Sequence, residues 1–306
     1  MRLGGRLWWR SQGWLVAGCL LVLTLAAVVI PPQPPHGGDD TLLALLPEPD
    51  PRRQEALIAL TAFLNQKVGL NLRVQTVADK TAFAAAAPAA LLTVSPDAVA
   101  LNLPLSQWQA LAAGRRRVPW HQRPAAVLVS RRGAADSVLA PWRTQPARTV
   151  FGDSLSLVCL APLCAEDTNG TLPAGVGWGS DPYDHGAVLA AVIHGAYDHA
   201  VVRQWDAEAA QLFGTLDPTR WQIRRLSEAL PDLVVMVARR APAALRLELQ
   251  EALTMLGRAD AEQDPVNRLV RAHLGQFGLD GFNLLLGQDC DRLRRLYGRC
   301  WLGSDR

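Results

Sequence analysis

His185 and Asp198 are two ionisable side chains placed near the two ends of one predicted helix. His185 closes a loop rich in Gly, Asp and Pro, and the apolar segment 187–193 follows it. Gly195 is expected to stop that helix, and the short strand 200–202 comes after Asp198. In open α/β sheets, ligands bind at the ends of such units. The stretch therefore predicts a ligand site with His185 and Asp198 as candidate contacts.

The histidines of this stretch could instead hold a metal ion. His194 and His199 are five residues apart and Gly195 lies between them, so they do not share one face of a helix. Structural metal sites need ligands that converge on one point. No metal site and no cofactor are therefore predicted.

Ser154 has a second interpretation. The sequence Gly152-Asp153-Ser154-Leu155 follows a predicted strand, as the nucleophile of one serine esterase family does. Such a serine needs a histidine that a carboxylate orients. Because about a hundred residues of the predicted extracellular part precede the motif and the later blocks of that family are absent, this enzyme is kept as an alternative only. A simpler interpretation is that Ser154 caps a helix.

The order of predicted elements indicates a parallel α/β sheet. Asp50 and Pro51 begin a helix that ends before Gly69. Strands are predicted at 41–46, 70–76, 90–94, 125–130, 148–151, 221–226 and 233–237, and helices at 78–87, 106–113, 155–160, 242–257, 266–276 and 290–298. The β-α-β-α-β order of the first elements favours parallel pairing.

Composition narrows the classes of partner. The chain has 306 residues, 49% of them hydrophobic, which is enough for a full core and about two lobes. The net charge is only +3, and Arg115–Arg117 is the longest basic run. Without a dense basic face, no nucleic-acid partner is predicted.

The N-terminal region predicts a membrane anchor. Three arginines within 1–13 precede the uncharged run 14–30, and the next basic residue is Arg52. This asymmetry places residues 1–13 in the cytoplasm and the rest of the chain outside. A cleaved signal peptide is the competing interpretation, but 26–31 is a poor cleavage site. We predict a single-pass transmembrane helix, the Pro/Gly-rich linker 31–40, and a periplasmic domain.

Four cysteines outside the anchor form two close pairs in the sequence. Cys159 lies near Cys164, and Cys290 lies near Cys300. In an oxidising compartment local pairing is expected, although four cysteines allow three connectivities. Four buried free thiols are the alternative.

From residue 41 onward the chain resembles the periplasmic substrate-binding proteins of phosphate, phosphite and phosphonate ABC importers. The resemblance is carried by four segments, which are 47–51 with its following helix, 185–202, the Ser-Pro-strand-Arg segment 227–240, and Gly281-Phe282 with a closing helix. It implies a type 2, two-lobe α/β fold, with lobe 1 formed by 41–124 and 258–306 and lobe 2 by 125–257.

The resemblance also implies a function without catalysis. The domain would bind a small anionic solute such as a phosphonate for an ABC permease or a sensor, held at the inner membrane by its N-terminal helix. Its implied ligand-binding residues are Ser154, Ser156, His185 and Asp198. Asp153 and Leu155 depart from the family's hydroxyl-rich loop, and Val99 stands where a tyrosine is common. These departures favour the alternative of a degenerate binding-protein fold that acts as a non-transporting interaction or sensor module.

Overall fold

The computed structural model describes residues 40–116, 124–133, 140–165, 174–258, 260 and 263–301. The predicted cytoplasmic segment 1–13, the predicted anchor 14–30 and all but one residue of the linker 31–40 lie outside these residues. Among the helices that the structure describes, none is long and apolar enough to cross a membrane.

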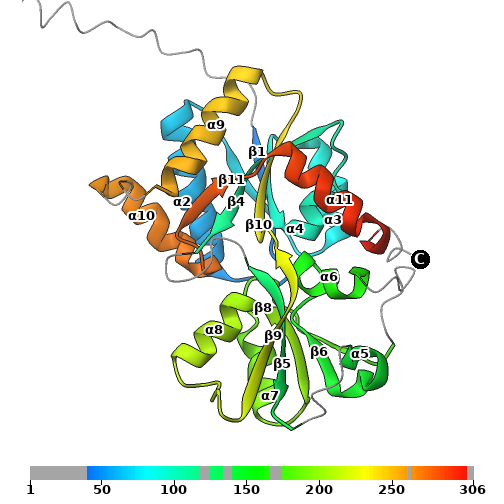
Figure 1. Cartoon of the computed structure of the whole chain (residues 1–306). Helices are drawn as coiled ribbons and strands as arrows, with labels where there is room; N and C mark the ends of the chain where they lie inside the picture. Colours follow the sequence, from blue (N-terminus) through cyan, green and yellow to red (C-terminus); the bar gives the residue numbers. More distant parts are fainter. Residues whose placement is uncertain are drawn as a thin grey trace, which may run out of the picture. The chain divides into compact units, whose positions relative to one another are not determined.

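Residues 39–306 form one compact unit with two lobes (Figure 1). The first lobe contains a six-stranded sheet in the order β11-β4-β10-β3-β1-β2. Its strands are β1 (Thr41–Leu45), β2 (Arg73–Val77), β3 (Leu92–Pro96), β4 (Trp108–Arg115), β10 (Leu233–Ala238) and β11 (Gly281–Leu284). Strand β1 pairs in parallel with both β2 and β3, which confirms the predicted parallel start.

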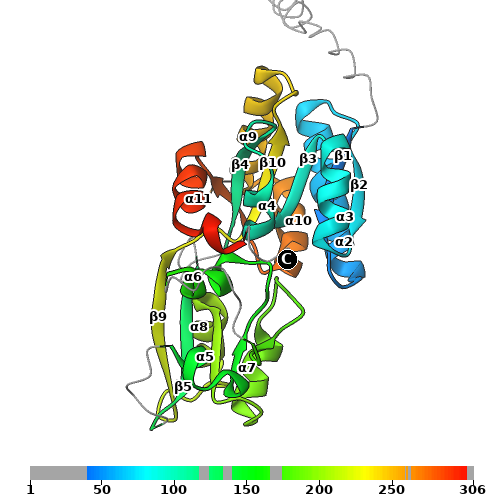
Figure 2. The ribbon, with the colours of Figure 1, turned by 90° about the vertical axis from the view of Figure 1, so that its right-hand side faces the viewer.

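Helices cover both faces of this sheet (Figure 2). One face packs against α2 (Pro51–Val68), α9 (Ala243–Leu256) and α10 (Pro265–Leu274), which is followed by η4 (Gly275–Phe277). The other face packs against α3 (Lys80–Ala86), η1 (Ala87–Ala89), α4 (Asp97–Asn102) and α11 (Gly287–Trp301). The start of α2 is as predicted, because the Asp50 carboxylate accepts the Arg52 N–H at 2.9 Å and Pro51 is the first helical residue.

The second lobe contains a five-stranded sheet in the order β7-β6-β8-β5-β9. Its strands are β5 (Ala125–Arg131), β6 (Thr149–Phe151), β7 (Gly177–Trp178), β8 (His199–Arg203) and β9 (Trp221–Ala229). Its helices are α5 (Pro141–Thr144), η2 (Pro146–Arg148), α6 (Leu157–Ala165), α7 (Gly186–Ile193) and α8 (Gln204–Leu212). Helices α7 and α8 share one apolar cluster with the strands of this sheet.

Two corrections to the predicted elements follow. The segment 106–113 was predicted as a helix, but Trp108–Arg115 is the buried strand β4 between β10 and β11. Its alanines favour a helix in isolation, and pairing in the centre of a sheet overrides that preference. The predicted return to lobe 1 at residue 258 is also too late, because β10 already pairs with β3 and β4 in the first sheet.

The two lobes share one buried apolar cluster. It joins Leu43 and Val99 of the first lobe to Phe151 and Val158 of the second. Helix α6 of the second lobe also packs against α11 of the first. The lobes are therefore in direct apolar contact, and the chain crosses between them after β4 and after β9.

Candidate ligand site

His185 is a fully buried side chain at the start of α7. Its Nδ1 accepts the backbone N–H of Arg203 at 3.1 Å, and its Nε2 lies 2.9 Å from Oδ2 of Asp153. Because a backbone N–H can only donate, the proton of this ring belongs on Nε2 and points at the carboxylate. A Cβ at residue 152 would lie 2.4 Å from the ring, so Gly152 leaves the room that His185 needs.

The carboxylate of Asp153 accepts hydrogen bonds from the loop before α6. Its Oδ1 accepts the N–H groups of Leu155 at 2.6 Å and Ser156 at 2.7 Å. Its Oδ2 accepts the Ser156 hydroxyl in addition to His185. Burial acts to raise the pKa of Asp153, but the hydrogen bonds from His185 and Ser156 outweigh it, so the pKa is lower than usual.

The predicted serines differ in their placement. Ser156 is buried against Asp153, whereas Ser154 is exposed. The carboxylate of Asp153 lies between the Ser156 hydroxyl and His185. The esterase alternative needs a histidine at the Ser154 hydroxyl. Ser154 is exposed, and both ring nitrogens of the buried His185 are engaged by Asp153 and by the Arg203 N–H, so this arrangement is not that of the esterase.

Asp198 does not join His185. It immediately precedes β8, whereas His185 contacts the last residue of that strand. Five residues of strand span about 16 Å. Asp198 forms instead a bidentate pair with Arg148, at 2.6 and 2.8 Å, and this partly exposed pair lowers the pKa of its carboxyl. The structure thus brings Ser156 and His185 together and leaves Asp198 at the opposite end of the strand.

Asp97 is a buried carboxylate of the first lobe that the sequence analysis did not identify as part of the site. Its Oδ1 accepts the N–H of Ala98 at 2.9 Å and the N–H of Leu157 at 2.8 Å. The second bond crosses from α4 in one lobe to the start of α6 in the other. Burial is the main cause that raises the pKa of Asp97 well above its usual range.

A second group that the sequence analysis missed is a buried ionic network around Arg203. Its Nε donates to Asp206 at 2.8 Å, and its Nη1 donates to both oxygens of Asp232 at 3.1 Å. Asp206 also pairs with Arg116 at 3.3 Å, and these arginines lower its pKa to about 2 despite its burial. The spacing of Arg203 and Asp206, three residues apart at the start of a helix, was the available signal.

Asp153, Cys159 and His185 are the cluster of potential metal ligands among the described residues. Their ligand atoms lie within 4.8 Å of one another and all three are buried. Burial raises the pKa of the Cys159 thiol well above its usual range, which disfavours the thiolate that a metal would need. Oδ2 of Asp153 is already engaged by His185 and Ser156, so this trio fits a hydrogen-bonded cluster better than a metal centre.

The predicted local disulfides are wrong. Cys159 and Cys290 are buried and are not disulfide-bonded, so neither close pair is bridged. Cys164 is disulfide-bonded, and its Sγ lies 3.9 Å from the backbone oxygen of Tyr297 in α11. The side chain of Cys300 lies outside those that the structure describes. Sequence proximity misled here because Cys159 points into the core, where it contacts the loop at Asp153.

Alkylation should separate these cysteines. In denaturant without reductant, we expect a thiol reagent to modify Cys159 and Cys290 but not Cys164, with modification of Cys164 only after reduction. Peptide mass mapping measures the three sites, and native protein provides the control, in which the two buried thiols stay unmodified. Modification of unreduced Cys164 would contradict the assignment.

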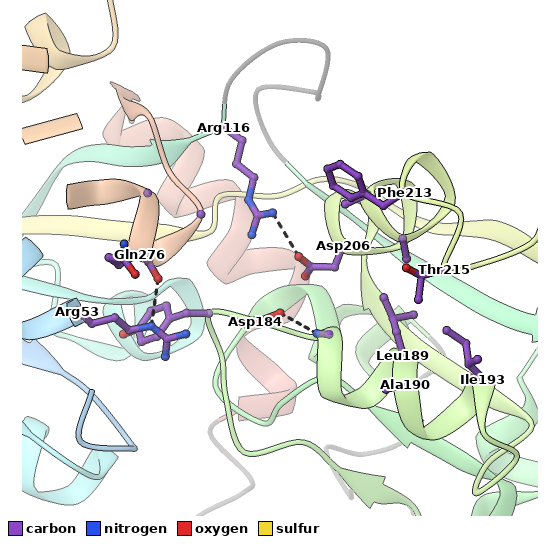
Figure 3. Close-up of a pocket in the computed structure, with 16 residues that line it drawn as sticks. Arg53, Arg116, Asp184, Leu189, Ala190, Ile193, Asp206, Phe213, Thr215 and Gln276 are labelled. Carbon is purple, nitrogen blue, oxygen red and sulfur yellow. Dashed lines mark hydrogen bonds and ion pairs between the residues drawn. The ribbon is translucent and has the colours of Figure 1, made fainter. Parts of the chain in front are cut away.

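A pocket of about 410 Å³ lies between the lobes, on the side of α7 and α8 (Figure 3). Arg53 and Gln276 from the first lobe and Asp184 and Asp206 from the second contribute polar groups. Arg116 extends into it from the end of β4. Its apolar wall consists of Leu189, Ala190, Ile193, Ala209, Ala210 and Phe213.

The arginines of this pocket differ in how well they are paired. Arg53 binds Asp181 bidentately, at 2.9 and 2.7 Å. The Arg116 guanidinium lies over the Trp205 ring, 5.0 Å from its centroid. Among the described atoms, its buried Nε has no hydrogen-bond partner. Burial is the main cause that lowers the pKa of Arg116, although Asp206 acts to raise it. The unpartnered Nε could donate to an added acceptor.

This chain has two α/β lobes joined by two crossing segments, which is the architecture of two-lobe periplasmic binding proteins. A family model for the periplasmic substrate-binding protein of phosphonate ABC transporters matches residues 147–284. The predicted resemblance to phosphonate-type binding proteins is therefore confirmed. No curated protein matches the chain.

Solved structures agree with this fold. XAC2383 from Xanthomonas citri, bound to ATP, is 17% identical with a TM-score of 0.61, over 88% of this chain and 99% of that one. PhnD1 from Prochlorococcus marinus, in complex with methylphosphonate, is 12% identical with a TM-score of 0.58, over 84% and 97%. A phosphonate-transporter binding component from Pseudomonas aeruginosa is 11% identical with a TM-score of 0.57, over 85% and 86%. At these identities the likeness establishes the fold alone.

Proposed function

We propose that this protein is a non-enzymatic, extracytoplasmic solute-binding protein that takes a small organic anion in the pocket between its lobes. The family match and the fold support a solute-binding role. The observation that carries the choice of site is Arg116, a half-buried guanidinium whose buried Nε has no hydrogen-bond partner among the described atoms, at a pocket that both lobes line. A membrane anchor at 14–30 and an ABC permease as partner are part of the same proposal.

The shape of the pocket favours an anion with an apolar body. Arg116 and Arg53 offer N–H donors at one side, where a carboxylate, phosphonate or phosphate group would bind. Leu189, Ile193 and Phe213 offer an apolar wall at the other. Because Asp184 and Asp206 also line the pocket, a compact, highly charged anion is less favoured than a larger one with a single acidic group.

A thermal-shift series tests this site. We expect phenylphosphonate to raise the melting temperature more than methylphosphonate or phosphate, since only the first reaches the apolar wall. A ligand at 100 times its dissociation constant stabilises the folded state by about 2.7 kcal/mol. Arg116→Gln should abolish the shift, whereas Arg148→Gln, at an exposed ion pair, should keep it. If no anion shifts the wild type, or if Arg116→Gln leaves the shift unchanged, the proposed site is wrong.

The contacts between the lobes favour a second function, that of a sensor or interaction domain. Arg53 to Asp181 and Leu157 to Asp97 join the lobes directly, beside the shared apolar cluster. A module held closed in this way would act as a sensor or interaction domain rather than as a carrier that opens and closes. Small-angle scattering decides between the two, because a carrier should contract when phenylphosphonate is added and a closed module should not change.

A further inference from the structure

Three successive backbone N–H groups before and at the start of α6 are all taken by carboxylates of the chain itself. Leu155 and Ser156 donate to Asp153 at 2.6 and 2.7 Å, and Leu157 donates to Asp97 at 2.8 Å. Consecutive N–H groups that converge at the start of a helix form an anion-binding concavity. In this chain the carboxylates of Asp153 and Asp97 occupy that concavity.

The remaining donors around Asp153 complete the coordination of an oxyanion. The Ser156 hydroxyl and Nε2 of His185 both donate to Oδ2, so the two carboxylate oxygens accept from four groups. Asp153, Ser156 and His185 are each at most 1% exposed as residues. Backbone N–H groups, a hydroxyl and an imidazole N–H are the donors that a bound phosphate or phosphonate oxygen would use.

The carboxylate of Asp97 provides a second observation at the same place. It is fully buried, and its Oδ2 has no hydrogen-bond partner among the described atoms. Its other oxygen lies on the N–H of Leu157, the first residue of α6. An acidic group from each lobe therefore meets the helix start, and the Asp97 contact ties α4 of the first lobe to α6 of the second.

We propose that Asp153 is a built-in ligand, whose carboxylate occupies a latent site for tetrahedral oxyanions before α6. In the wild-type protein phosphate cannot enter, because a buried negative charge already holds the donors. Replacing Asp153 with serine removes that charge and leaves the N–H groups of Leu155 and Ser156, the Ser156 hydroxyl and His185 without this acceptor, while the Leu157 N–H stays on Asp97. The emptied concavity should then bind inorganic phosphate.

The experiment compares the wild type with Asp153→Ser in phosphate and in sodium chloride of equal ionic strength, which controls for screening. For Asp153→Ser, phosphate at 100 times its dissociation constant should raise the melting temperature by about 5 °C or more. The wild type should not shift. If Asp153→Ser is unfolded in chloride, phosphate should restore its circular-dichroism spectrum. Absence of both the shift and the rescue would overturn the proposal, as would an equal shift in the wild type.

A second substitution separates this site from the pocket at Arg116. In the double variant Asp153→Ser/Arg116→Gln, the phosphate shift should persist, because the latent site does not use Arg116. Loss of the shift would place phosphate in the pocket and overturn the proposal. Asp153→Asn is the matched control, since its side chain has the same shape as aspartate, still fills the concavity, and should gain no phosphate binding.

Discussion

Replacing Arg203 with methionine is expected to lower the free energy of unfolding by about 3–5 kcal/mol, the cost of leaving buried charges without a partner. The guanidinium is fully buried and binds Asp206 at 2.8 Å and Asp232 at 3.1 Å. It also donates to the carbonyl of Pro182 at 3.3 Å. Its removal leaves two carboxylates in the interior, with Arg116 as the remaining partner of Asp206.

Urea titration followed by circular dichroism measures this loss. Asp198→Asn is the matched control, because it breaks a bidentate arginine–aspartate pair that is partly exposed. Such surface pairs contribute little, so the control should unfold at nearly the wild-type urea concentration. If Arg203→Met were as stable as Asp198→Asn, the network would not stabilise the fold in the way that its geometry indicates.

The network around Arg203 also contacts the ligand site. The backbone N–H of Arg203 donates to His185, and the side chain binds Asp232 at the segment that returns to the first lobe. Arg203 therefore fixes the imidazole that Asp153 needs as a donor, and at the same time anchors a crossing segment. Because Arg203→Met keeps the backbone N–H, the contact to His185 should survive the loss of the side chain.

Local signals explain which elements the sequence predicts well. Asp50, Pro51 and Gly69 mark the two ends of α2 through capping and a left-handed backbone, and the structure places both ends there. These interactions involve residues close in sequence. The strand β4 has no such signal, because its alanines favour a helix and only pairing with β10 and β11 makes it a strand.

The sequence predicts only the part of the candidate site that depends on local signals. His185 and Asp198 flank one helix in sequence, but the eight residues of α7 alone separate their ends by about 12 Å, so the two cannot share a small ligand. Asp153 departs from the hydroxyl-rich loop of the resembled family. In the folded chain its own carboxylate accepts the N–H groups of residues two and three positions later, which is a common local motif of aspartate.

Asp97 could not be identified from sequence, because its partners are distant in the chain. Its hydrogen bond to Leu157 joins residues 60 positions apart. Pro96-Asp97 has the composition of a helix start, which predicts an exposed cap rather than a fully buried acid. Asp97 contacts the second lobe only because α4 and the start of α6 lie next to each other in the fold.

Substituting asparagine for Asp97 should remove a pH dependence of stability. Burial, together with the negative charges of Asp232 and Asp153, raises the pKa of Asp97 in the folded state, whereas an unfolded aspartate titrates near 3.9. The folded state therefore binds more protons between these two pKa values. Stability contributed by the protonated acid is fully present below the unfolded pKa and is lost as the pH rises through the folded pKa, with a slope of at most about 1.4 kcal/mol per pH unit.

Asparagine keeps an oxygen for the N–H groups of Ala98 and Leu157 but carries no charge at any pH. The difference in unfolding free energy between Asp97→Asn and the wild type should therefore grow in favour of the variant as pH rises from 4 to 8. Taking this difference cancels the other titrating groups, among them Asp206, as long as their pKa values are the same in both proteins. A difference that stays constant with pH would show that Asp97 is ionised in the fold. The lobes would then be joined at this point by a buried carboxylate on the start of α6, and not by a neutral acid.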